Sequence, residues 1–242
     1  MVGVIILGIE TATQQVGCAL GGAEGVFASF HAAKGRRHAE TLAPAIQFVC
    51  RQARVGLDEV FVVAVDVGPG LFTGLRVGVA TAKAIAQALR VPMIGLSSLD
   101  LLAFAVRHTD RLIATVVDAR RNEVFCALYR PAPGGVQRIS QPRVCSPREL
   151  AADIMARGED CLLVGDGALR YASSFDDRRH VELGHAGLAY PSAAALVELA
   201  HPKAIREEFV QPGALEPLYL RKSDAEINWE LHPSAGRQER SA

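Results

Sequence analysis

Short apolar runs alternate with amphipathic segments along the chain, and the period of the pattern changes from one segment to the next. The runs at 2–9 and 60–68 are rich in valine and isoleucine, which is typical of buried strands. The first half therefore predicts strands at 2–9, 16–22 and 26–33, a helix from about His38 to Ala53, a strand at 60–68, a helix to about Leu89, and a strand at 91–98.

The same pattern starts again after residue 111. "LIATVVDARRNEVFCALYR" (112–130) predicts a strand, a tight polar turn and a second strand. The offset from Cys18 to Cys126 is 108 residues, and at this offset V-x-C-A-L returns and Glu10 corresponds to Asp118. Two interpretations stay open, a duplicated unit that opens each of two lobes and a pair of unrelated hairpins.

The second half continues with a helix from Ser146 to about Arg157, a strand at 161–167 and a helix around Pro191–Leu199. Interleaved strands and helices predict an α/β protein with mixed sheets. We expect an N-terminal lobe at 1–108 that carries partner-docking helices and a C-terminal lobe at 109–200. A C-terminal segment at 201–242 should partly return to the N-terminal lobe and end frayed.

Charge and cysteine content narrow the class of protein. Lysine plus arginine and aspartate plus glutamate both total 26, so no overall field attracts nucleic acid, and an RNA-directed role would need phosphate contacts from another subunit. Five scattered cysteines without C-x-x-C favour a reducing compartment. The first residues lack a basic signal-peptide region, and no apolar run is long enough for a membrane span. These features predict a cytoplasmic protein without membrane contact.

"DVGPGLFTGLRVG" (66–78) has the glycines of a phosphate loop but the spacing of neither common kind. Leu75 and Arg76 follow Gly74, where a Walker A loop needs lysine and then serine or threonine. The glycines at 68, 70 and 74 also miss the G-x-G-x-x-G fingerprint. What stays possible is an anion at the N-terminus of the following helix.

The helix after this loop has two apolar faces, whereas a surface helix needs one. Either another element of the chain covers the second face, or the face contacts a partner. The predicted helix that begins at His38 also has two apolar faces. The predicted partner-binding residues are Thr41, Ala45, Phe48, Val77, Ala80, Thr81, Ala84 and Ala88.

Several motifs, taken in the order in which they follow one another along the chain, make nearly the whole chain resemble the bacterial TsaB family. The most specific match is "VDVGPGLFTGLRVGVATAKAIA". Supporting matches, through their order, are "ILGIETATQQVGCAL", "RRHAETLAPAI", "VVDARRNEVFCALY", "LLVGDGA" and "PLYLRKSDAEI". The resemblance implies the actin-like, sugar-kinase-like ATPase fold with two duplicated lobes.

The resemblance also implies a function. It is that of a non-catalytic scaffold subunit, needed for threonylcarbamoyladenosine at position 37 of tRNAs that decode ANN codons. A homologous catalytic subunit, TsaD, would transfer the threonylcarbamoyl group, and the ATPase TsaE would reset the complex. Members of the family pair with TsaD through their first two helices and can form a homodimer when isolated. Contact with tRNA would come through the complex.

The residues that a catalytic relative would need are incomplete here. The metal-binding pair H-x-x-x-H lacks its second histidine, because Leu42 stands four residues after His38. The second phosphate turn, 118–123, has no glycine, so bulky side chains would block a triphosphate. We therefore expect no cofactor, no metal and no catalytic residue. The degenerate phosphate-loop positions are Glu10, Thr11, Thr13, Asp118 and Arg120.

Three rival functions stay open from the sequence. An active ATP-dependent phosphotransferase of the same fold would need a glycine-rich second turn, and a metallopeptidase-like hydrolase would need the histidine pair. A homodimeric scaffold unrelated to tRNA contradicts no physical feature of the chain, and only the family signature argues against it.

Overall fold

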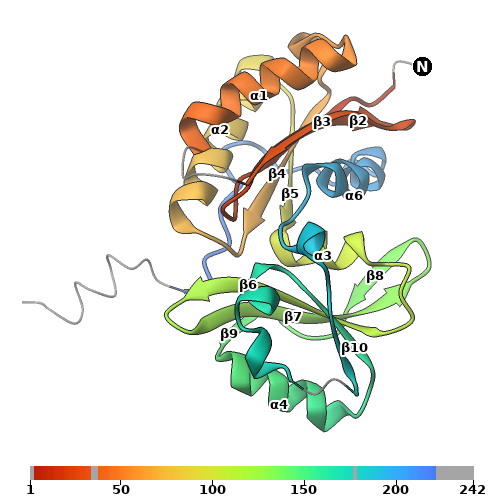
Figure 1. Ribbon diagram of the computed structural model, residues 1–242. Coiled ribbons are helices and arrows are strands. Elements are labelled where there is room, and N and C mark those ends of the chain that lie inside the picture. Colours follow the sequence, from red (N-terminus) through yellow and green to blue (C-terminus); the bar gives the residue numbers. More distant parts are fainter. Residues whose placement is uncertain (1–2, 34–37, 177–178, 222–242) are drawn as a thin grey trace, which may run out of the picture.

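Two β-sheets form the framework of the computed structural model, which describes residues 3–33, 38–176 and 179–221 (Figure 1). The predicted frayed end of the C-terminal segment lies outside these residues. The short 3-10 helices are η1 (Leu57–Glu59), η2 (Ala172–Ser174) and η3 (Ala186–Leu188).

The first sheet has the order β3-β2-β1-β4-β5. Its strands are β1 (Ile6–Glu10), β2 (Val16–Gly22), β3 (Gly25–Ala32), β4 (Val62–Gly68) and β5 (Met93–Ser97). β1, β2 and β3 are antiparallel neighbours, whereas β4 and β5 run parallel to β1. Helices α1 (His38–Ala53) and α2 (Phe72–Leu89) cover one face, and their apolar sides build a core with β1, β2 and β4 (Figure 1). Both predicted helices are confirmed.

The second sheet repeats this order of elements. It consists of β6 (Leu112–Arg120), β7 (Glu123–Ala132), β8 (Gly135–Arg138), β9 (Arg143–Cys145), β10 (Cys161–Val164) and β11 (Val181–Leu183). The strand order is β11-β10-β6-β7-β8, with β9 also paired to β7. Helix α4 (Pro147–Arg157) starts at a capping box formed by Ser146 and Glu149, and α5 (Asp166–Arg170) follows β10. In both sheets an antiparallel hairpin and a third strand precede two parallel strands, which supports duplication.

The register of the two hairpins corrects the predicted correspondence. Ile9 pairs with Cys18 in the first hairpin, whereas Cys126 pairs with Val116 and not with Val117. A shift of one residue moves a strand's side chains to the opposite face. Glu10 and Asp118 are therefore not equivalent, and the first strands correspond at an offset one residue shorter than 108.

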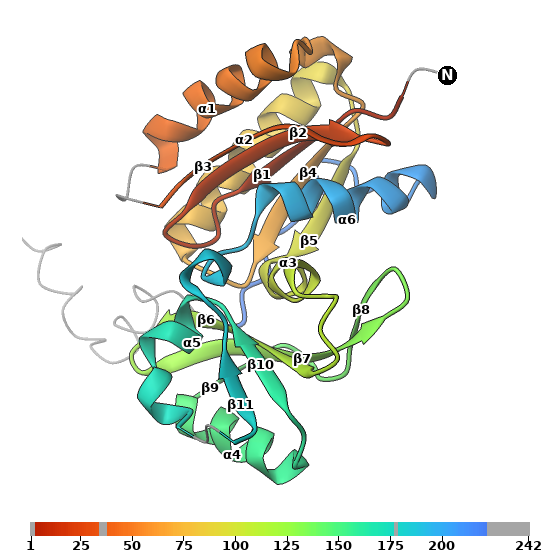
Figure 2. The same ribbon diagram turned by 45° about the vertical axis from the view of Figure 1, so that its right-hand side comes forward.

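The last helix of each half packs on the sheet of the other half. Helix α3 (Ser98–Ala105) follows β5 but places Leu99 and Leu102 against Ile113 of the second sheet. Helix α6 (Ala193–Ile205) follows β11, yet it lies on the first sheet (Figure 2). There Leu196 packs against Ile6. The two sheets are therefore interlocked by exchanged helices.

The segment after α6 runs back along the first sheet. Val210 and Met93 exchange backbone hydrogen bonds at 2.8 and 3.0 Å, and the amide of Leu218 donates to the carbonyl of Val67 at 2.7 Å. The boundaries 1–108, 109–200 and 201–242 stay predictions, although α6, most of which they assign to the C-terminal lobe, lies on the first sheet. Within the described residues, no helix combines the length and the apolar character that crossing a bilayer requires.

Because α6 packs on the first sheet, we expect the stability of the protein to depend strongly on the side chains of α6 that face this sheet. Leu196→Ala removes a fully buried side chain between α6 and the first sheet, and should lower the free energy of unfolding by about 2–5 kcal/mol. Ile205→Ala, on the exposed end of the same helix, should change it by less than about 0.5 kcal/mol. Urea unfolding followed by circular dichroism measures both. Equal effects of the two variants would contradict this packing.

Candidate functional site

The turn between β1 and β2 is buried, and its polar groups bind partners inside the chain. The amide of Ala12 donates to Glu10 Oε1 at 2.8 Å. Gln15 Nε2 donates to the carbonyl of Pro191 at 2.8 Å, and His38 Nε2 donates to the carbonyl of Thr13 at 2.9 Å. These contacts tie the turn to the start of α1 and to the segment before α6.

Helix α2 lies directly on this turn, and the glycines of the 66–78 loop allow that approach. A Cβ atom at Gly70, Gly74 or Gly78 would overlap, respectively, the carbonyl oxygen of Ala12, the carbonyl oxygen of Thr11, or Thr11 Oγ1. Thr11 Oγ1 donates to the carbonyl of Gly74 at 2.8 Å, and the amide of Leu71 donates to the carbonyl of Ala12 at 2.6 Å. The glycine spacing therefore serves contact between a helix and a turn.

The second turn keeps a glycine-like backbone without glycine. Arg120, Arg121 and Asn122 have φ angles of 65°, 53° and 59°, in the left-handed region that glycine adopts most readily. The carboxylate of Asp118 accepts hydrogen bonds from the Arg120 amide and from the hydroxyl of Tyr171 at 3.0 and 3.1 Å.

Two guanidinium groups also bind Asp118. Its Oδ2 lies 3.3 Å from Arg120 Nη1 and 3.3 Å from Arg170 Nη1. Two cations thus lie beside this single carboxylate, which is 3% exposed. Of the five degenerate phosphate-loop positions, the structure gathers Glu10, Thr11 and Thr13 in the first turn and Asp118 and Arg120 in the second.

A small hollow lies between the second turn, the start of α2 and the C-terminal segment. It has a volume of about 80 Å³ and is lined by Gly70, Leu71, Phe72, Asp118, Ala119, Arg120, Phe125, Leu218, Tyr219, Leu220 and Arg221. The ring of Tyr219 packs against that of Phe72 at 5.2 Å between centroids, so the C-terminal segment occupies this space. Pockets for drug-sized ligands usually measure about 300–1,000 Å³. This hollow is smaller than such pockets.

Two buried carboxyl groups, those of Glu10 and Asp66, lie near the carboxyl ends of the adjacent parallel strands β1 and β4. Asp66 is not among the site residues predicted from the sequence. Asp66 Oδ1 accepts hydrogen bonds from the Gly68 amide and from Ser98 Oγ, both at 2.7 Å, whereas its buried Oδ2 has no partner. Burial raises the pKa of Asp66 to about 7, and burial together with the charge of Asp66 raises the pKa of Glu10 well above its ordinary value. The signal in the sequence that could have identified Asp66 is its position, an acidic residue inside the apolar run 60–68.

The predicted docking residues lie on α1 and α2, which pack on the same face of the first sheet (Figure 2). Phe48, Ala80, Ala84 and Ala88 are exposed, whereas Thr41, Val77 and Thr81 are half-buried. Phe48 also contacts Phe30 of β3 edge-on, at 6.2 Å between ring centroids.

Ala45 does not belong to this exposed set. Only 3% of it is exposed, because α1 packs closely enough on the sheet to bring Ala45 into the core beside Ile46 and Val49. Leu42 is in the same core and 1% exposed, which gives it a packing role at the position of the missing histidine. Within residues 3–33, 38–176 and 179–221, no group of three His, Cys, Asp or Glu side chains could hold a metal ion.

Comparison with known sequences identifies relatives across most of the chain. The family model TsaD, described as tRNA N6-adenosine threonylcarbamoyltransferase, matches residues 28–229. The Bacillus subtilis tRNA threonylcarbamoyladenosine biosynthesis protein TsaB is 27% identical over 93% of this chain and 97% of the relative. An uncharacterized protein of Mycobacterium leprae is 36% identical over 91% of this chain, but the chain spans only 56% of that relative's length.

Comparison with solved structures gives neighbours consistent with the sequence relatives. A Pseudomonas aeruginosa protein, described as uncharacterized with similarity to the peptidase YeaZ, has a TM-score of 0.80 at 29% identity, over 90% of this chain and 100% of that chain. Component A of the (R)-2-hydroxyglutaryl-CoA dehydratase of Acidaminococcus fermentans reaches a TM-score of 0.50 at 12% identity, over 84% of this chain and 99% of that one. The latter likeness concerns the fold alone. The fold is the predicted actin-like one, with two lobes.

The contact between α2 and the first turn predicts that Gly74 does not tolerate a side chain. Gly74→Ala should lower the free energy of unfolding by about 1–3 kcal/mol, because its Cβ atom meets a backbone oxygen. Gly213→Ala has open space and should stay within about 0.5 kcal/mol of the unsubstituted protein. Thermal and urea unfolding compare the two variants. Unchanged stability of Gly74→Ala would show that α2 does not approach the turn this closely.

Asp66 predicts a dependence of stability on pH. The folded protein holds the proton of this carboxyl more tightly than the unfolded chain, because the pKa rises from 3.8 to about 7. Its contribution to stability is therefore complete below pH 4 and is lost as the pH rises to about 7. Relative to the unsubstituted protein, Asp66→Asn should gain stability over this interval, measured by urea unfolding at several pH values. Parallel pH profiles would contradict the raised pKa.

Proposed function

The chain belongs to the TsaB group of the tRNA N6-adenosine threonylcarbamoyltransferase family, and from this premise we propose that it is a non-catalytic subunit in threonylcarbamoyladenosine formation on tRNA. The observation that carries this proposal is the outer side of α2. Ala80, Ala84 and Ala88 follow each other at intervals of four residues and are all exposed. Residues at this interval lie on one helical face, and small side chains let another helix approach closely.

The proposed partner is a catalytic subunit of the TsaD type. The match of the TsaD family model to residues 28–229 supports homology between the two chains. Homologous subunits can pair through equivalent helices, so α1 and α2 are the proposed contact. In the absence of this partner, the same face would pair with a second copy of the chain.

The two turns support the absence of catalysis in this subunit. The first turn is tied to α2 and α1, and the second carries three arginine or asparagine side chains on glycine-like backbone. Two arginines lie beside Asp118, and the hollow beside this second turn measures about 80 Å³. We propose that the transfer reaction takes place in the partner. Contacts with TsaE and tRNA, the specificity for tRNAs that decode ANN codons, and action in the cytoplasm are parts of the same proposal.

A tagged purification from the native cell at low salt, with quantitative mass spectrometry, tests the partnership. We expect a near-stoichiometric larger homologue that carries H-x-x-x-H. If the chain elutes without such a homologue and binds ATP in a calorimetric titration, the phosphotransferase alternative replaces this proposal.

A charged side chain on α2 should prevent the contact. Ala84→Arg introduces a long cation at the centre of the proposed face and should weaken binding to the TsaD-type subunit by about 100-fold or more. Ala156→Arg, at an exposed position of α4 in the other lobe, is the matched control and should bind as the unsubstituted chain does. Calorimetry measures both, after circular dichroism has established that they are folded. Equal affinity of the two variants would remove α2 from the interface.

A further inference from the structure

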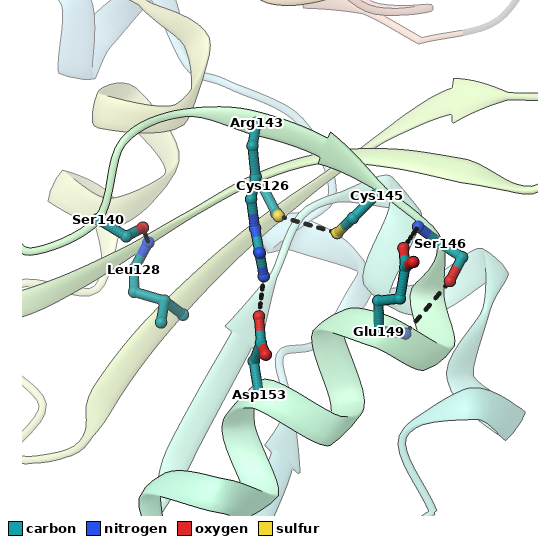
Figure 3. A network of polar contacts seen from close by, with 8 residues as sticks. All are labelled: Cys126, Leu128, Ser140, Arg143, Cys145, Ser146, Glu149 and Asp153. Atoms are coloured by element: carbon teal, nitrogen blue, oxygen red, sulfur yellow. Dashed lines mark hydrogen bonds and ion pairs between the residues drawn. The ribbon is translucent and has the colours of Figure 1, made fainter.

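Two cysteine thiols lie side by side on the second sheet, a few residues from the second turn and outside helices α1 and α2. Cys126 is on β7 and Cys145 on β9, and their sulfur atoms are 3.4 Å apart (Figure 3). Both are free thiols. In the strand register Cys126 pairs with Arg143 and Val124 pairs with Cys145, so the cysteines are diagonal neighbours on one face.

A charged group completes this cluster. Arg143 lies beside Cys126 and is held by an ion pair with Asp153 of α4 (Figure 3). The hydrogen bond with Cys145 and the neighbouring Arg143 lower the pKa of Cys126, although burial raises it, and the pKa of Cys145 is raised by its hydrogen bond to Cys126. The arrangement favours a thiolate on Cys126 and a protonated thiol on Cys145.

The cluster borders the surface, although Cys126 itself is buried and only 1% exposed, so a peroxide reaches its sulfur only when neighbouring side chains move aside. A surface hollow of about 300 Å³ is lined by Cys126 together with Ser140, Arg143, Leu150 and Asp153. Cys145 is half-buried.

The other cysteines differ from this pair. Burial raises the pKa of Cys18 and of Cys161 to about 12 and also raises that of Cys50. Among the five cysteines, the geometry and charge needed for oxidation meet at Cys126 and Cys145.

We propose that Cys126 and Cys145 form a peroxide-sensitive dithiol, in which Cys126 reacts first and Cys145 then closes a reversible disulfide. The Cys126 thiolate attacks the outer oxygen of a hydroperoxide, so that an S–O bond forms and the O–O bond breaks. The leaving alkoxide or hydroxide takes a proton and departs as an alcohol or water. Cys145 sulfur then attacks the Cys126 sulfenic acid, and the S–O bond breaks. The departing hydroxide takes the Cys145 proton and leaves as water, so one hydroperoxide oxidises two thiols.

The backbone around Cys145 permits closure of this bond. The sulfur atoms must approach from 3.4 Å to about 2.05 Å. β9 consists of three residues and pairs only with β7 among the described strands, so a shift disturbs few hydrogen bonds. A diagonal pair across two strands spans about 7–8 Å between Cα atoms, beyond the usual disulfide range of about 4.4–6.8 Å, so closure requires β9 to shift toward β7. The resulting strain favours a bond that a thiol reductant reopens easily.

Intact-mass spectrometry of the reduced full-length chain, treated with one equivalent of hydrogen peroxide, tests this proposal. We expect a loss of two hydrogen atoms and recovery with dithiothreitol. Trypsin cleaves between the two cysteines, so an unreduced digest should contain one linked species that joins peptide 122–138 to peptide 144–148. No mass change, or a link that involves Cys18, Cys50 or Cys161, would overturn the proposal.

Single variants assign the roles of the two thiols, with folding checked by circular dichroism. Cys145→Ser should stop at a sulfenic acid on Cys126, captured by dimedone, whereas Cys126→Ser should leave Cys145 reduced. Arg143→Gln should slow the reaction by about tenfold, the effect of one unit in the pKa of Cys126. Cys50→Ser is the matched control and should form the disulfide at the original rate. Oxidation of Cys145 at an unchanged rate in Cys126→Ser would overturn the assignment.

Discussion

Helix α2 and the loop before it lie so close to the turn after β1 that one loop position and two helix positions have no room for a side chain. The carbonyl oxygens of Thr11 and Ala12 and the hydroxyl of Thr11 occupy the space that side chains at Gly70, Gly74 and Gly78 would need. The approach fixes the position of α2 on the first sheet, and with it the direction in which Ala80, Ala84 and Ala88 point. One contact between a helix and a turn thus accounts for the glycine motif, for the filled first turn and for the exposed face.

Much of the fold could be predicted from the sequence because local patterns determine it. The helix from His38 to Ala53 has the predicted bounds, and Ser146 is the N-cap of the helix predicted to end at about Arg157. Local patterns could not predict which of the two sheets α3 and α6 pack on. Periodicity shows that a helix has an apolar side, but it does not show which of two apolar sheets that side meets.

The candidate site could be predicted less completely. Ala45 seemed to be on an outer face because helical spacing assigns a direction but not the width of the buried side. The pairing of Glu10 with Asp118 is wrong by one residue, since the hairpin register depends on the turn between the strands and not on the V-x-C-A-L match. Equivalence instead links Thr11, whose hydroxyl donates to α2, to Asp118, whose backbone amide donates to the carboxylate of Asp166 on α5.

The exchanged helices have a consequence for folding during synthesis. The first sheet is complete in sequence at Ser97, but the helix that covers its inner face begins only at Ala193. Until that helix has left the ribosome, Ile6, Ala64 and Ile94 have no apolar partner from it. The nascent first sheet then exposes a hydrophobic surface that is prone to aggregation. The first sheet therefore completes its core only after the second half of the chain has been synthesised.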